Sequence, residues 1–466
     1  MTSMHVRHFG NTANNAYYNA RMLAELEGIP SDLPYSMFGL IHAISAPAWE
    51  AVDFEVPSAD WVPVPDWSPF PEAVAVNAEY SDLPRPVAAD AGASEGGAQA
   101  KVFLAGPRRW ANAAIVGKAW AQPLFELDTR QRLASRLPIP LADETIDIVY
   151  GADSLTVVKP SAPTTTVSLE HGTVRWIGDG SPRQRIDRRA YREQVQQGAH
   201  LWVTNLDPRT LEIAEDVMPG RWSALPHPYL PDSRVPFAET SRRGELLALT
   251  RSGALVLLPS SQNWGIHHDK GSMKALTAFV ELRRAGVDVG LVAIEWGLQL
   301  AESKAFLKDA GVADNVAWVS PMAKLSLQRT MANVDVVWDQ FGLEAFGGLA
   351  NRAVEQGTPF VSRGLAPEGE RLIGGPVPWR QAATIDDIVR ETRQVLDEIA
   401  EKGRAAVMQD YGTRYRAWLW ERHAPNITTT LQRELYTTML DGSFTAGAAA
   451  PDRWAQLVAE GVRKDG

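Results

Sequence analysis

The sequence predicts an α/β protein in which two Rossmann-like domains face each other across a cleft. Three observations indicate this fold. Strand and helix patterns alternate from residue 254 to residue 338, an arrangement that requires a parallel sheet with right-handed crossovers. A separate strand, turn and helix begin the chain within residues 4–28. Between the two regions lies a proline-rich segment, residues 226–236, whose composition is typical of an interdomain linker.

Length and composition limit the class of protein. A chain of 466 residues is too long for one hydrophobic core, and a hydrophobic content of 45% is typical of a globular protein. The formal charge of 46 − 56 = −10 argues against nucleic acid as a partner. The absence of cysteine excludes disulfides and thiolate zinc sites. Residues 1–8 lack the apolar core of a signal peptide, and the most apolar stretch, 246–258, is too short to span a bilayer, so we expect a cytoplasmic protein.

The first half of the chain contains the elements of one domain. A strand at residues 4–9 leads into the turn 10–15. In the helix that follows, Ala16, Ala20 and Leu23 have helical spacing and Gly28 is placed as the C-cap. Residues 48–100 show no sustained period. Further strands are predicted at 145–150 and 164–169, after a strand and a helix within 101–135.

The second half has the clearer pattern. It predicts strands at 254–258, 289–294, 315–319 and 334–338, and helices at 272–285, 298–310 and 321–333. A further helix begins near Phe346 and ends at Gly357, and a short strand resumes after Pro359. Helices occupy much of 384–441, and we expect the tail after Ser443 to be loosely attached.

Four loops follow predicted strands at their carboxyl ends, where α/β proteins bind ligands. The first loop lacks the glycine fingerprint of dinucleotide-binding proteins, and its polar residues could either cap the helix or contact a substrate. Its candidates are Gly10, Asn11, Asn14 and Asn15. The second loop places His171 directly after a strand, where the imidazole could bond a sugar hydroxyl or a phosphate, or could have only a structural role.

The third loop is a candidate diphosphate site. Lys270 stands beside Gly271 just before a helix, so its ammonium can reach a diphosphate while the helix dipole assists. The preceding run His267-His268-Asp269 contains residue types that bind metals. Adjacent histidines rarely converge on one ion without a third ligand at helical spacing, so we expect no metal here.

The fourth loop is the most informative part of the chain. Asp339 ends a strand, and a glycine-bearing turn leads through Glu344 to Gly347 and Gly348 at the start of a helix. The first N–H groups of a helix lack partners, and the helix dipole favours negative charge there. Glu344 can bond the hydroxyls of whatever carries the phosphate. This combination suits a nucleotide sugar.

Several motifs are missing, and one basic run stands out. The sequence has no Asp-x-Asp metal motif, no Gly-x-Ser-x-Gly elbow and no Walker-type loop. The basic run is either a solvated helix face or a patch for an anionic acceptor or an acidic membrane surface. Its members are Arg183, Arg185, Arg188, Arg189 and Arg192.

Taken together, these motifs resemble the GT-B-fold glycosyltransferases of the retaining family 4 type, in particular those of polysaccharide and antibiotic glycosylation. The family pattern Glu-x-Phe-Gly, then Ala, Gly and Pro, is matched by Glu344, Phe346, Gly347, Ala353, Gly357 and Pro359. Smaller matches are Asp339-Gln340, Lys270-Gly271, His171-Gly172, the linker Pro226-His-Pro228 and the opening turn 10–15.

The resemblance implies a domain arrangement and a reaction. Residues 1–225 would bind the acceptor, 241–415 would bind the nucleotide sugar, and helices in 416–442 would cross back to the first domain before the tail 443–466. The reaction would move a sugar from a nucleoside diphosphate to a hydroxyl or amine with retention, with no metal or cofactor. The acceptor would be a carbohydrate, a lipid-linked molecule or a natural product, and the arginine run would allow peripheral contact with the inner membrane face.

The resemblance also implies roles for individual residues. The catalytic group would comprise His171, Lys270 and Glu344. The donor would be bound by Gly10, Asn11, Ser261, Lys270, Glu295, Asp339, Glu344, Phe346, Gly347, Gly348 and Arg352. The acceptor would be bound by Asn14, Asn15, His171 and the arginine of the pair Arg175-Trp176.

Two positions depart from the family pattern. Arg352 stands where a second glutamate commonly binds ribose, and Ser261 stands where an arginine commonly lies beside the diphosphate. Either Glu355 or Glu295 substitutes, or nucleotide affinity is weak. A non-catalytic homologue that binds a sugar or stabilises a partner is therefore an alternative, and a sugar-nucleotide epimerase of the same fold is a third.

Overall fold

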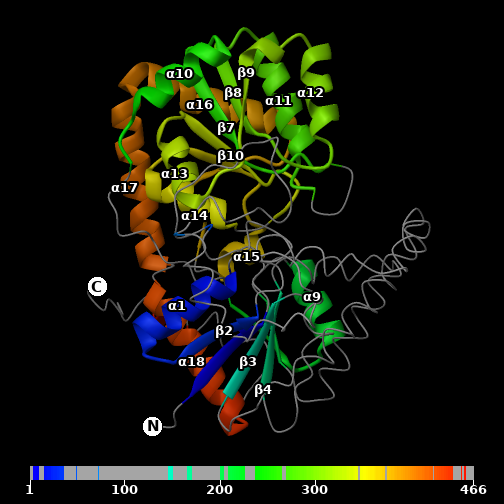
Figure 1. Cartoon of the computed structure of the whole chain (residues 1–466), viewed down its shortest axis with the longest axis vertical. Coiled ribbons are helices and arrows are strands. Elements are labelled where there is room, and N and C mark those ends of the chain that lie inside the picture. The colour runs from blue at the N-terminus through cyan, green and yellow to red at the C-terminus, as the bar shows by residue number, and fades with distance from the viewer. Residues whose placement is uncertain are drawn as a thin grey trace, which may run out of the picture.

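The computed structural model contains two parallel α/β sheets, one from each half of the chain (Figure 1). It describes residues 4–9, 15–35, 49, 72, 145–150, 165–170, 200–203, 208–225, 237–264, 269–344, 347–372, 375–422, 425–443, 453 and 456–457. The linker 226–236, the arginine run and most of 48–144 lie outside these residues.

The first sheet is built from six strands in the order β2-β1-β3-β4-β5-β6, and every neighbouring pair is parallel. The strands are β1 (His5–Phe9), β2 (Ser31–Tyr35), β3 (Thr145–Tyr150), β4 (Thr165–Glu170), β5 (His200–Val203) and β6 (Trp222–Ala224). Helices α1 (Asn15–Glu27) and α9 (Pro208–Val217) accompany them. The chain moves outward from β1 first to β2 and then, on its other side, to β3, so the strand order reverses between β1 and β3.

The second sheet has the order β12-β11-β10-β7-β8-β9, again parallel throughout. Its strands are β7 (Ala254–Leu258), β8 (Val289–Ile294), β9 (Val316–Val319), β10 (Val336–Asp339), β11 (Phe360–Ser362) and β12 (Arg380–Gln381). Its topological switch point lies between β7 and β10, where an open α/β sheet binds its ligand. Every residue of β8 and β10 is buried, as expected for strands covered on both faces.

Helices surround the second sheet and cover its core. They are α10 (Ser241–Thr250), α11 (Ser272–Arg284), α12 (Leu300–Asp309), α13 (Lys324–Ala332), α14 (Gly348–Gln356), α15 (Pro367–Leu372) and α16 (Ile385–Lys402), with the short 3-10 helix η6 (Ala313–Asn315). At the start of α16, Thr384 and Asp387 exchange side-chain and backbone hydrogen bonds in a capping box. Helix α11 buries Leu276, Phe279 and Leu282 against the sheet.

Two helices connect the second sheet back to the first. Helix α17 (Arg404–Arg422) runs from one sheet toward the other, and α18 (Pro425–Asp441) lies beside α1 (Figure 1). The Glu27 carboxylate of α1 accepts hydrogen bonds from Thr429 and Thr430 at 3.0 and 3.1 Å and pairs with Arg433 at 2.5 Å. The end of the chain thus packs against its beginning.

A second contact joins the two halves directly. Lys324, the first residue of α13, lies 4.9 Å over the ring of Tyr18 in α1, and its ammonium donates to the Tyr18 hydroxyl. Both side chains are almost completely buried. Since α13 belongs to the second sheet and α1 to the first, this contact helps to fix how the two halves face each other.

The predicted fold class is confirmed, and most predicted elements lie within a few residues of the observed ones. The helix expected at 321–333 spans Lys324–Ala332, and Gly28 and Gly357 end their helices with positive φ, as predicted. The sequence did not predict the strands β2, β5, β6 and β12 or the helices α9, α10 and α15. The expectation of a loosely attached tail was wrong where the tail is described, because Leu457 is buried in the first core and Arg453 pairs with Glu434.

Candidate active site

The switch point of the second sheet brings two polar side chains together. Ser260 follows β7, and its hydroxyl donates to Oδ1 of Asp339 at the end of β10. Asp339 is 1% exposed. Burial raises the pKa of its carboxyl, while the nearby Lys270 ammonium, the Ser260 hydroxyl and the N–H of Gln340 act in the opposite direction. The structure thus brings Lys270 and Asp339, two candidates from the sequence, to the same edge of the sheet.

Two glycines allow the loops after β7 and β10 to touch through their backbones. A Cβ on Gly271 would lie 2.5 Å from the Gly342 nitrogen, and one on Gly342 would lie 2.7 Å from the Asp269 carbonyl oxygen. The Gly342 N–H donates to the Lys270 carbonyl at 3.0 Å. Gly271 also has a φ of 82°, a region that favours glycine. This backbone contact holds Lys270 beside the end of β10.

Helix α11 begins at this backbone contact. Its N-cap is Gly271, which has no side chain to accept hydrogen bonds from the first turn. Farther along the helix, Lys274 donates to the Phe341 carbonyl at 3.2 Å and to the Ala383 carbonyl at 3.1 Å. Lys274 therefore braces the β10 loop against the helix, a role that nothing in the sequence pattern indicated. Lys270, which directly precedes the N-cap, is therefore the lysine placed to bind an anion at the N-terminus of α11.

Helix α14 also begins with a glycine N-cap. The N-cap of α14 is Gly347, again without a side chain. A Cβ on Gly347 would lie 2.3 Å from Gln340 Nε2, so the glycine packs closely against that side chain. Gln340 itself has a φ of 55°, unusual for a residue with a side chain, and its buried Oε1 has no hydrogen-bond partner in the described part of the chain. The strained Gln340 thus links the end of β10 to the start of α14.

Glu344 is held by an arginine that the sequence analysis did not single out. Arg363, directly after β11, donates from Nε and Nη2 to Glu344 Oε1 at 3.0 and 2.5 Å. The signal that could have found it is its position at the carboxyl end of a predicted strand, the criterion that selected the other candidates.

Arg352 and Ser261, the two positions that depart from the family pattern, are both at least partly buried. Arg352 lies in α14, half-buried, and its Nε is buried without a hydrogen bond while the side chain has other contacts. Ser261 is buried, and its hydroxyl accepts from Asn263 at 3.1 Å. The two proposed substitutes for a ribose-binding glutamate are both engaged: Glu295 pairs with Lys304, and Glu355 accepts from Gln328 at 2.7 Å.

Comparison with known proteins bears on the fold and on the class of protein. No model of a known protein family matches the chain. The 2-deoxystreptamine glucosyltransferase of Streptomyces kanamyceticus is 25% identical over 321 residues, 66% of this chain and 78% of that protein. A glycosyltransferase structure from Rickettsia africae ESF-5 aligns over 94% of this chain and 99% of its own, with a TM-score of 0.53 and 10% identity. TarM of S. aureus aligns over 65% of this chain and 58% of its own, with a TM-score of 0.50 and 11% identity.

This chain has the GT-B fold and is similar in sequence to a glycosyltransferase. In this GT-B protein Lys270, Asp339, Glu344 and Gly347 lie at the ends of β7 and β10 or in the loops that follow them. The candidates of the first sheet are mostly outside the described residues. Those outside are Gly10, Asn11, Asn14, His171 and the pair Arg175-Trp176, and with them Phe346 of the second half. Asn15 is described as the first residue of α1, and its buried Nδ2 has no hydrogen-bond partner there.

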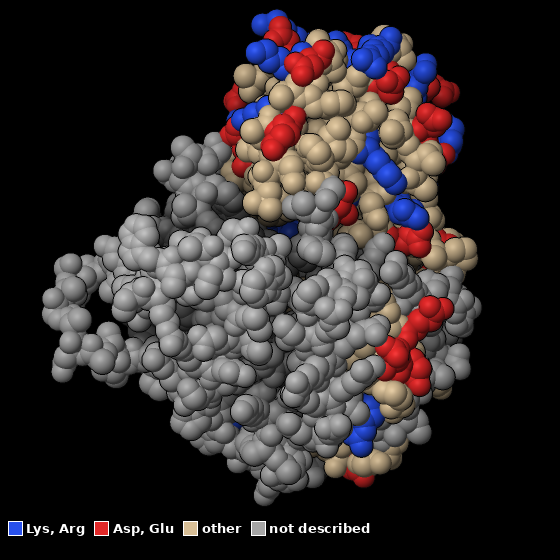
Figure 2. Space-filling model, turned by 90° about the vertical axis from the view of Figure 1, so that its right-hand side faces the viewer, with Lys and Arg blue, Asp and Glu red and all other residues tan. Residues whose placement is uncertain are grey.

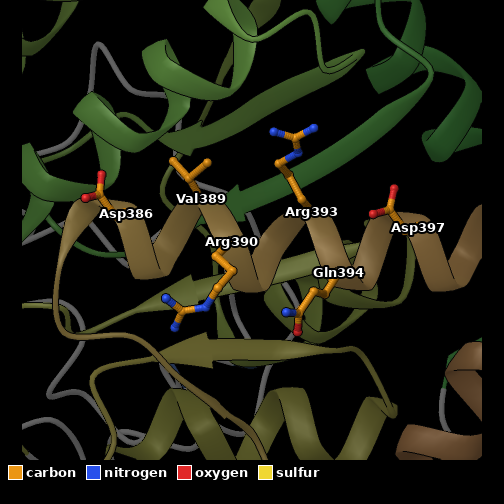
Figure 3. Close-up of a pocket in the computed structure, with 6 residues that line it drawn as sticks. All are labelled: Asp386, Val389, Arg390, Arg393, Gln394 and Asp397. Carbon is orange, nitrogen blue, oxygen red and sulfur yellow. The ribbon is translucent and has the colours of Figure 1, made fainter.

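Two surface features lie on the second half of the chain. A pocket of about 430 Å³ runs along one face of α16, and its side chains extend from that single helix (Figure 3). Its lining residues are Asp386, Val389, Arg390, Arg393, Gln394 and Asp397. It includes Asp386 in the first turn of α16 but no strand end, so we do not assign it to the donor. On the face in Figure 2, acidic and basic side chains are interspersed over the second-sheet half.

Among the residues that the structure describes, no helix is long and apolar enough to cross a membrane. Within the same residues, no three histidine or carboxylate side chains group as metal ligands.

Proposed function

We propose that the protein transfers a sugar from a nucleoside diphosphate to a hydroxyl or amine acceptor, with retention of anomeric configuration. Two similarities support this. The Streptomyces kanamyceticus relative is named a glucosyltransferase of 2-deoxystreptamine, an aminocyclitol that offers both hydroxyls and amines. The TarM structure contains UDP. We therefore place the nucleoside diphosphate on the second sheet and the acceptor on the first.

The observation that carries the proposal is the convergence of cationic and dipolar groups at the β7–β10 switch point. Lys270 stands at the N-terminus of α11, and Gly347 begins α14 on the other side of the Gln340 turn. Both helix ends offer backbone N–H groups to an anion. When the bond to the sugar breaks, negative charge develops on the departing diphosphate. Lys270 and the first N–H groups of α14 would stabilise that charge without a metal.

The remaining roles follow from the same placement. Glu344 would hold the hydroxyls of the donor sugar, and His171 would orient the donor sugar or the acceptor. In the front-face mechanism that the resemblance implies, the leaving phosphate takes the acceptor proton. This mechanism accounts for a site in which no side-chain nucleophile could be assigned from the sequence.

The experiment is an assay of nucleoside diphosphate release. The protein is incubated with UDP-, GDP- and TDP-sugars and a panel of aminocyclitol and carbohydrate acceptors, and the product is examined by NMR for its anomeric configuration. We expect release that depends on acceptor and a product with the donor's configuration. A product of inverted configuration would refute retention.

A second candidate function is a non-catalytic subunit that binds a sugar or a partner. The observation favouring it is the pair of departures, Arg352 and Ser261, together with the engagement of Glu295 and Glu355 in contacts of their own. Binding of a nucleoside diphosphate without turnover of any donor, in the same assay, would favour this reading.

A further inference from the structure

Arg363 contacts Glu344, the side chain proposed to bind the donor sugar, and it engages one of the two carboxylate oxygens. Its Nε and Nη2 both donate to Oε1 of Glu344, at 3.0 and 2.5 Å. No hydrogen bond to Oε2 occurs in the described part of the chain. The two side chains are 31% and 36% exposed, so the pair is accessible to a ligand rather than enclosed in the core.

The residues on either side of Arg363 make defined contacts. Strand β11 pairs with β10 so that Ser362, the preceding residue, lies opposite Asp339. The following residue, Gly364, has a φ of 76°, and a Cβ there would lie 2.3 Å from the Gln381 Oε1 atom. The Gly364 N–H also donates to the Ser362 hydroxyl at 3.3 Å. The guanidinium therefore projects from a strand end that is fixed on both sides.

We propose that Arg363 is a positioning residue for the donor sugar, an inference that rests on the proposed function. By occupying Oε1, the guanidinium holds the Glu344 carboxylate in one orientation and leaves Oε2 to accept hydrogen bonds from sugar hydroxyls. The pair has no net charge, so it suits a neutral hexose better than a uronic acid or an amino sugar. Because Arg363 acts through Glu344, it should affect binding of the sugar and leave binding of the nucleoside diphosphate unchanged.

The test compares two ligands that differ only in the sugar. UDP-glucose and UDP are titrated calorimetrically into the wild-type protein, Arg363→Gln and Arg363→Lys. We expect Arg363→Gln to weaken UDP-glucose binding about tenfold, the effect of losing one charged hydrogen-bonding partner, with UDP affinity unchanged. Arg363→Lys, which keeps the charge but not the two-point contact, should recover part of the loss.

Two controls separate positioning from general damage. Arg390→Gln removes an exposed arginine that pairs with Asp387 on α16, and it should bind both ligands as the wild type does. In a double-mutant cycle, adding Arg363→Gln to Glu344→Gln should have little further effect on UDP-glucose. Additive effects of the two substitutions would overturn the inference.

The remaining outcomes are distinct. Equal loss of UDP and UDP-glucose in both Arg363 variants would mean a structural role, and wild-type affinity for UDP-glucose in Arg363→Gln would mean no role; each overturns the inference and leaves the proposed function standing. Failure of the wild-type protein to bind any nucleoside diphosphate, with GDP and TDP tested beside UDP, would instead overturn the proposed function and this inference with it.

Discussion

The two ends of the proposed donor site are built differently. At the diphosphate end, the loops after β7 and β10 meet backbone to backbone at Gly271 and Gly342, over the buried Asp339. At the sugar end, Glu344 and Arg363 meet through long side chains that are about a third exposed. The first end is fixed by packing and the second by charge. We infer that substitutions at the first end alter the shape of the site, whereas those at the second end alter which ligand it prefers.

The difference has a physical basis in how each contact responds to substitution. A Cβ placed within 3 Å of backbone atoms can be relieved only by moving a loop, and overpacking of this kind typically destabilises by about 1–3 kcal/mol. A partly exposed ion pair is screened by solvent and contributes about 0–1 kcal/mol to folding. The sugar end can therefore change its residues with little effect on stability.

The largest expected effect is at the diphosphate end. Lys270→Ala should lower turnover by two or more powers of ten, because one lost electrostatic contact to the departing diphosphate is worth roughly 3 kcal/mol. The melting temperature should stay close to that of the wild type, since Lys270 is only half-buried. Lys308→Ala, an exposed lysine of α12, is the matched control and should keep full activity. Full activity in Lys270→Ala would place the diphosphate elsewhere.

The next prediction concerns Arg352, at the ribose position between the two ends, and the sign of the change in affinity decides its role. If Arg352 hinders ribose binding, Arg352→Glu should tighten nucleoside diphosphate affinity by about 1.5–3 kcal/mol, the value of a charged hydrogen bond. If Arg352 contacts a phosphate, the same change should weaken binding through repulsion. Calorimetric titration with UDP, GDP and TDP distinguishes the two, and Arg393→Glu on the pocket face of α16 controls for the charge reversal. No change with any of the three would mean that Arg352 does not contact the nucleotide.

A smaller effect on stability should distinguish packing from charge. Gly271→Ala adds a methyl 2.5 Å from the Gly342 nitrogen at a φ of 82°, so we expect chemical denaturation to show a loss of about 1–3 kcal/mol in the free energy of unfolding. Gly244→Ala in α10 meets no atom within 4 Å and should be neutral or stabilising by up to about 1 kcal/mol. If both variants had the same stability, the two loops would not be in contact as described.

The smallest expected effect is none at all. Treatment with EDTA should leave turnover unchanged, because Lys270 and the helix N-termini are proposed to stabilise the leaving group. Loss of activity with EDTA and its recovery with manganese or magnesium would refute that account.

The sequence predicted the fold better than the contacts within the site. Regular alternation in the second half placed β7 to β10, and Gly357 marked a helix end, because both signals are local. Three of the four missed strands had weak local signals: β2 is an edge strand with Pro34 within it, and β6 and β12 are edge strands of three and two residues. Lys270, Asp339 and Glu344 could be selected because each lies at a strand end or beside a helix N-terminus.

Other features depend on residues far apart in the chain. The apposition of Gly271 and Gly342, the bond from Arg363 to Glu344 and the contact of Lys324 with Tyr18 leave no periodic pattern in one sequence. The engagement of Glu295 by Lys304 is of the same kind. The domain boundaries, the arginine run as a membrane contact and the acceptor residues of the first sheet stay predictions.

The central claim is that a nucleoside diphosphate binds at the β7–β10 edge of the second sheet, and hydrogen–deuterium exchange tests it most directly. Exchange is measured on the intact protein with and without saturating UDP, and with GDP and TDP in turn. The account predicts slower exchange of backbone amides in residues 269–274 and 340–350, with little change along α16 at 386–397. Protection confined to the α16 surface, or to the first sheet, would contradict it.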